Sequence, residues 1–228
     1  MPVDTEKHTI DILYSFLLAV FISLFILCNV IGVTRYVDLS FSLFNIHIPM
    51  HMSLGGVAFP ITFFISQYIS LRYGQKIAYS LIGVSIAVNA LIMLLMLLGG
   101  LLPRYEYTAS ACPNLYQHIE WFAFAGISSS LTAFALSGFF NIMLFNVCMR
   151  TLGQGQTGIA SFLASAVSQF IDTSVIYIML FFTHSMPIQP DQNILIQLAI
   201  YIFTGYTYKF LWSIGGSGLI HAMSKKPA

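Results

Sequence analysis

The stretch Ser161–Tyr177, SFLASAVSQFIDTSVIY, places a carboxylate, Asp172, inside an otherwise apolar run. On a helix, residues spaced three and four apart share one face. The polar residues of this stretch follow that spacing: Ser161, Ser165, Ser168, Gln169 and Asp172. Because a carboxylate at the centre of a bilayer is costly, this face cannot point at lipid. The stretch therefore predicts a membrane-spanning helix whose polar face looks inward, onto a partner or water.

The composition indicates that lipid is the solvent of the whole chain. Only 7% of the 228 residues are charged and 57% are hydrophobic, whereas soluble domains carry about 25% charged residues. The formal net charge of +1 gives no indication of a nucleic-acid partner. We expect an all-α membrane protein formed by a single domain over residues 1–228, with the bilayer as its partner.

Six segments are long and apolar enough to be transmembrane helices, which need about 20 mostly apolar residues. Short polar connections separate them, so no soluble domain is expected. The predicted spans are about residues 10–33, 53–71, 77–102, 122–148, 159–182 and 194–223.

The distribution of Lys and Arg predicts the orientation of this bundle, because cytoplasmic loops are enriched in both. One set of loops and ends holds Lys7, Arg72, Lys76, Arg150, Lys225 and Lys226, and the other holds Arg35 and Arg104. Both termini are therefore predicted to be cytoplasmic. The first outer loop, LSFSLFNIHIPMHM at residues 39–52, alternates apolar and small polar residues and predicts a short hairpin.

Lys209 is the one Lys or Arg inside a predicted span. It shares a helix face with Tyr206 and Ser213. At about 1.5 Å per residue, Asp172 and Lys209 both fall near the midplane, because they lie about thirteen and fifteen residues in from opposite ends of their spans. We expect the two side chains to meet there.

Weaker polar stripes occur on the other four spans, and together with the charged pair they predict a polar cavity. They comprise Asn29; Pro60 and Gln67; Ser85 and Asn89; and Gly126, Ser130, Ser137 and Asn141. The alternative is purely structural, with a salt bridge and interhelical hydrogen bonds. We favour packing for the small residues. For Asp172 and Lys209 we favour function, because ionisable groups inside membranes usually mark pathways.

Two local patterns suggest other chemistry. HIPMHM brings together His47, Met50, His51 and Met52, ligand types that suit copper. GGSG at 215–218 fits the Gly-x-Ser-Gly pattern of rhomboid proteases, with Ser217 and His221 as a candidate pair. We favour packing for both, and we predict no metal and no cofactor. The widely spaced Cys28, Cys112 and Cys148 indicate neither a disulfide framework nor a cluster.

Three stretches in order resemble the vitamin uptake transporter family, whose characterised members are queuosine precursor transporters. They are GGVAFPITFFISQYISLRYGQKIA at 55–78, ASFLASAVSQFIDTSVIY at 160–177 and YTYKF at 206–210. The resemblance covers nearly the whole chain. Two positions depart from it, since Gln67 and Leu71 stand where members of the family carry acidic residues.

The resemblance implies a multi-pass protein of a bacterial-type inner membrane that imports 7-deazaguanines such as preQ0 and preQ1. In that reading Asp172 accepts hydrogen bonds from the ring N–H and the exocyclic amine of the substrate. Lys209 keeps Asp172 ionised while the site is empty. Gln169, Gln67 and Asn141 would bind further polar atoms, and Phe63 and Trp212 would stack on the ring. The polar stripes add Tyr206, Asn29 and Asn89 to the predicted substrate site.

Two alternatives to a transporter that works by itself stay open at this point. One is a substrate-binding membrane subunit that needs a separate ATPase module. The other is an intramembrane hydrolase with Ser217 as nucleophile, although we expect no enzyme activity. Besides the small-molecule substrate, two partners stay open: a second copy of the chain and an energising module.

Overall fold

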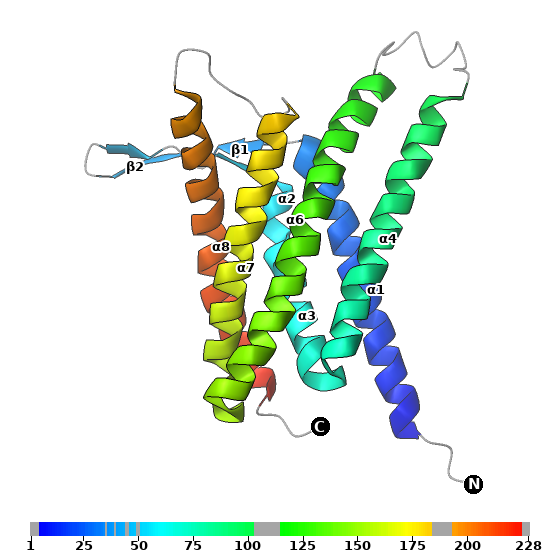
Figure 1. Cartoon of the computed structure of the whole chain (residues 1–228), viewed down its shortest axis with the longest axis vertical. Helices are drawn as coiled ribbons and strands as arrows, with labels where there is room; N and C mark the ends of the chain where they lie inside the picture. The colour runs from blue at the N-terminus through cyan, green and yellow to red at the C-terminus, as the bar shows by residue number, and fades with distance from the viewer. Residues whose placement is uncertain are drawn as a thin grey trace.

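The computed structural model describes residues 5–34, 36–38, 40–43, 46–48, 51–102, 115–183 and 193–224. It is a bundle of helices with a small strand ribbon at one end (Figure 1). The helices are α1 (Thr5–Thr34), α2 (Gly55–Ala58), α3 (Pro60–Tyr73), α4 (Gln75–Gly100), α6 (Leu115–Leu152), the 3-10 turn η1 (Gln154–Gln156), α7 (Thr157–Phe182) and α8 (Ile194–Ser224).

Five of these helices contain stretches that are long and apolar enough to cross a membrane. The stretches are Ile12–Gly32, Gln75–Gly100, Phe124–Leu152, Thr157–Phe182 and Ile194–Ser224. They correspond to the predicted spans one, three, four, five and six, with ends shifted by up to several residues. The protein is therefore a helical, multi-pass membrane protein, as the composition predicts.

The predicted second span, residues 53–71, differs from the other five because it is divided. Proline has no backbone N–H, so Pro60 cannot bond to the carbonyl four residues earlier. The helical stretch is interrupted at Phe59, with α2 before it and the 14-residue α3 after it. Leu54 and Phe59 keep right-handed helical backbone angles, so the interruption removes hydrogen bonds with little change of direction.

Helix α3 is short but lies at the centre of the bundle, in contact with α1, α4, α6, α7 and α8. It buries apolar and polar side chains alike, among them Phe63, Gln67 and Ile69. Close approach at two of its neighbours requires glycine: a Cβ on Gly216 of α8 would lie 2.1 Å from the Phe64 ring. Gly55 of α2 approaches the backbone of α1 equally closely.

The predicted outer hairpin is present as two nested antiparallel pairs. Strand β1 (Tyr36–Asp38) pairs with β4 (His51–Ser53), and β2 (Phe41–Leu43) pairs with β3 (Ile46–Ile48). The ribbon lies across one end of the bundle, where β4 contacts α1 and α8. We call this the ribbon end.

Helix α1 begins, and helix α8 ends, at the end of the bundle opposite the ribbon end (Figure 1). Residues 55–73 lead from the ribbon end toward that opposite end, and α4 returns from it. Of the residues used to predict orientation, Arg35, Arg104, Lys225 and Lys226 lie outside the described residues, as does the side chain of Lys7.

Candidate functional site

Asp172 and Lys209 form an ion pair in the interior of the bundle. Lys209 Nζ lies 2.7 Å from Asp172 Oδ2, and Ser137 Oγ donates to Asp172 Oδ1 at 3.2 Å. Asp172 is fully buried and Lys209 is 5% exposed. Each lies at least ten residues from both ends of its helix, so the structure brings the pair together at mid-depth, as the sequence predicts.

The interrupted helix places an aromatic ring against this ion pair. Phe59, at the break between α2 and α3, lies with its ring centroid 5.3 Å from Lys209 Nζ, within the range of a cation–π contact. The hydroxyl of Thr62 donates to the Phe59 carbonyl at 2.7 Å. Because Pro60 fixes the break, the sequence FPIT places a buried ring beside the only ion pair found in the described part of the chain.

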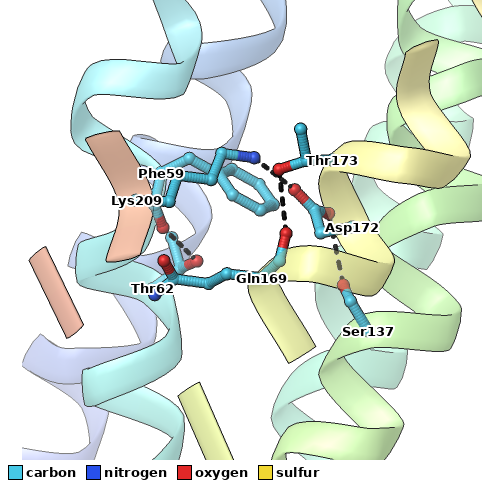
Figure 2. A network of polar contacts seen from close by, with 7 residues as sticks. All are labelled: Phe59, Thr62, Ser137, Gln169, Asp172, Thr173 and Lys209. Carbon is cyan, nitrogen blue, oxygen red and sulfur yellow. Dashed lines mark hydrogen bonds and ion pairs between the residues drawn. The ribbon is translucent and has the colours of Figure 1, made fainter. Parts of the chain in front are cut away.

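Gln169 lies three residues before Asp172 on α7, on the same buried face. Its side chain is fully buried, yet neither Nε2 nor Oε1 has a hydrogen-bond partner within the described residues. The neighbouring Ser168 hydroxyl is unpaired as well. Figure 2 shows the Gln169 side chain extending from α7 toward Phe59 and Thr62. An unpaired buried amide of this kind requires an explanation.

Gln67 and Asn141 belong to a different cluster, one in which the polar atoms bond to one another. Gln67 Nε2 donates to Asn141 Oδ1 at 2.8 Å and to Ser165 Oγ at 2.9 Å, while Ser161 Oγ donates to Gln67 Oε1. Asn141 Nδ2 donates in turn to Ser66 Oγ and to the Phe63 carbonyl. We call these residues the Gln67 cluster. It joins α3, α6 and α7.

The remaining predicted site residues lie in other surroundings. Asn29 donates to Asn89 at 2.9 Å and so joins α1 to α4. Phe63 packs in the apolar core. Tyr206 makes ring contacts with Phe170 and Phe210 on the α7–α8 surface, and Trp212 Nε1 donates to Tyr208 Oη at 2.6 Å.

Sequence reasoning missed two residues at the ion pair, Phe59 and Thr62, and did not assign Ser137 to the site. The sequence contains a signal for Phe59 and one for Ser137. Pro60 marks a helix break, which singles out the residue before it. Ser137 lies on the same stripe as Asn141, one turn away, and thus at the depth of Asp172.

The two other chemistries receive no support from the described residues. No group of three or more His, Cys, Asp or Glu side chains in that part of the chain could hold a metal ion. The side chains of His47, Met50, His51 and Met52 lie outside the described residues, as does Cys112, while Cys28 and Cys148 are free.

In the GGSG stretch, the Ser217 hydroxyl donates to the Ile214 carbonyl at 2.8 Å. His221 Nδ1 has no hydrogen-bond partner among the described residues. Gly216, which packs closely on Phe64, occupies the variable position of this pattern, whereas a Cβ on Gly215 or Gly218 would meet nothing within 4 Å.

A comparison with protein families matches residues 53–222, from the end of the ribbon through α8, to the model of the vitamin uptake transporters. The chain belongs to the vitamin uptake transporter family. The matched region contains Asp172, Lys209, Gln169 and the Gln67 cluster. Comparison with curated proteins and with solved structures gives no match. Family membership supports a membrane transporter with a small-molecule substrate.

The arrangement offers a transported molecule two adjacent kinds of recognition. Asp172 provides charged acceptors held by Lys209 and Ser137, and Gln169 provides one acceptor and a free donor group. The aromatic ring of Phe59 lies against the same pair. Hydrogen-bonding groups and an aromatic ring therefore lie against the same buried ion pair.

Proposed function

We propose that the protein imports a 7-deazaguanine, a queuosine precursor such as preQ0 or preQ1, across a bacterial-type inner membrane. Membership of the vitamin uptake transporter family supports import of a small molecule. The resemblance of three ordered stretches to queuosine precursor transporters supports the substrate. The observation that carries the proposal is the fully buried Asp172, held at mid-depth with acceptor capacity to spare.

The acceptor capacity of Asp172 follows from its bonds. An ionised carboxylate has about four lone-pair sites, and each oxygen receives one described bond, from Ser137 or from Lys209. One site per oxygen is left. A 7-deazaguanine carries its N1–H and its exocyclic amine side by side, so the carboxylate can accept both. Charge-assisted bonds of this type are about twice as strong as neutral ones.

Phe59 is proposed as the ring that stacks on the substrate, in place of Phe63 and Trp212. It lies at the Pro60 break, next to Lys209. Discontinuous helices form the binding sites of many transporters, and the interruption between α2 and α3, four residues into this passage, places Phe59 beside the ion pair.

Six crossings with both termini in the cytoplasm are part of the proposal. Residues 55–73 are about 28 Å long at 1.5 Å per residue, close to the roughly 30 Å of a hydrocarbon core. With this divided passage the number of crossings is even, in agreement with α1 beginning where α8 ends (Figure 1). Alkaline phosphatase fused after Ala228 should be inactive, and an active fusion would contradict the orientation.

The substrate is tested by uptake of labelled preQ1 into liposomes that contain the purified chain. Asp172→Asn replaces one acceptor oxygen by a donor amide that faces a substrate N–H. The lost charge-assisted bond and the donor–donor clash are worth about 2–4 kcal/mol, or roughly 30-fold or more in uptake. The matched control is Asp38→Asn, which makes the same change on an exposed strand residue.

Two results would contradict this assignment. Transport by Asp172→Asn at the parental rate would make Asp172 structural. Uptake that requires an added ATPase module would favour the substrate-binding subunit over a transporter that works alone.

A further inference from the structure

The amide of Gln169 is the largest unexplained polar group in the described interior. It is fully buried, and both its donor and its acceptor atoms lack partners there. Burial of an unpaired amide destabilises a fold, because the group loses its bonds to water and gains none. A leucine or methionine would fill the same space without that penalty.

The two threonine hydroxyls around the ion pair are engaged elsewhere. The Thr62 hydroxyl donates to the Phe59 carbonyl, and the Thr173 hydroxyl donates at 2.8 Å to the backbone carbonyl of Gln169 itself. Figure 2 shows these residues around Asp172 and Lys209, with the Gln169 side chain reaching between α7 and α3. The described side chains supply no partner for the amide, so it is available to a bound molecule.

The chemistry of the amide specifies that partner. A glutamine side chain presents an acceptor and a donor side by side, so it pairs with an adjacent donor and acceptor on a planar ring. If Asp172 holds N1–H and the exocyclic amine of a 7-deazaguanine, the atoms of the ring system itself leave one such edge. That edge consists of N9–H and N3. On the opposite side, the carbonyl at C6 is followed by ring carbons and by no ring N–H.

We propose that Gln169 binds the N3/N9–H edge of the substrate and thereby restricts transport to free bases. The inference rests on the proposed function and adds a specificity-determining residue to it. In a nucleoside N9 carries the sugar, so the donor is missing and Oε1 of Gln169 is left buried without a partner. A site built to bond an N–H discriminates strongly against analogues that lack it.

The test is competition against uptake of labelled preQ1 by liposomes containing the full chain. Three unlabelled competitors are compared: preQ0, its N9-methyl derivative, which lacks the donor, and its 3-deaza derivative, which lacks the acceptor. For the parent protein we expect the N9-methyl derivative to compete at least about 30-fold more weakly than preQ0, and the 3-deaza derivative at least about tenfold more weakly. Equal competition by all three would overturn the inference without the use of any variant.

The variant Gln169→Met keeps the length of the side chain and removes both polar atoms. Competition by preQ0 should weaken about tenfold or more, and the preference for preQ0 over its N9-methyl derivative should fall to within about threefold. Full retention of that preference in Gln169→Met would show that other residues exclude N9-substituted bases sterically. That result would overturn the assignment. The control Gln197→Met changes another buried glutamine, twelve residues before Lys209 on α8, and should keep the parental preference.

Failure of the inference is distinguishable from failure of the proposed function. If the parent takes up no 7-deazaguanine, both are wrong. If the parent takes up preQ1 but accepts N9-substituted bases equally, the proposed function stands and Gln169 has another role.

Discussion

Gln67 and Gln169 are both fully buried, and they differ in whether their amides are bonded. Gln67 donates to Asn141 and Ser165 and accepts from Ser161. Gln169 makes no side-chain hydrogen bond within the described residues. The same residue type, fully buried in the same bundle, is thus satisfied in one place and unsatisfied in the other.

On the proposed function, the difference separates structural polarity from functional polarity. The Gln67 cluster fits the role of interhelical hydrogen bonding in membranes, where each bond contributes modestly and small residues allow close approach. The residues around Asp172 keep an unpaired amide and an ion pair, which hydrophobic packing could replace without loss of stability. Features that reduce stability are expected where binding requires them.

The largest effect on stability is expected at Lys209. Lys209→Met leaves Asp172 buried and unpaired, which should lower the free energy of unfolding by about 3–5 kcal/mol. The double variant Asp172→Leu/Lys209→Met should recover most of that loss. Unfolding in mixed detergent micelles measures both. Losses that simply add would mean that the two residues do not interact.

A smaller loss is expected for Gln67→Met. This change removes the bonds to Asn141, Ser161 and Ser165 together, and should lower the free energy of unfolding by about 2 kcal/mol. Gln156→Met, at an exposed glutamine of η1, measured in the same micelles, supplies the control for the substitution itself. An effect no greater than that of the control would remove the distinction between the two glutamines.

Gln169→Met should have a small effect of the opposite sign. Because the amide has no described partner, the free energy of unfolding should stay constant or rise by up to about 1 kcal/mol, while uptake of preQ1 falls. A loss of stability equal to that of Gln67→Met would show that Gln169 is a structural residue.

The smallest effect is expected for Ser217→Ala, which tests a polar residue outside both regions. Its hydroxyl bonds only locally, to the Ile214 carbonyl. The free energy of unfolding should change by less than about 0.5 kcal/mol, and uptake should equal that of the parent. If the variant loses uptake, or loses a peptide hydrolysis activity that the parent shows, the hydrolase interpretation would be revived.

Much of the fold could be predicted because lipid imposes one rule on every span. Apolar length predicts helices, and five helices of sufficient length occupy the predicted places. Residues 53–71 were less predictable, because their composition is that of a span while Pro60 interrupts the hydrogen bonding locally. The contact of Asp172 with Lys209 followed from depth along two helices, which the rise per residue determines.

The sequence by itself determined that the chain lies in a membrane, that its polar residues face inward, and that Asp172 and Lys209 lie at similar depths. Periodicity and charge carry that information, since each helix must hide its polar face from lipid. The tertiary structure alone decided which polar groups bond to each other. Asn29, Gln67, Asn141 and Gln169 all look alike as inward amides in the sequence. Only the rotation and spacing of neighbouring helices bring partners within about 3 Å of the first three and leave Gln169 without one.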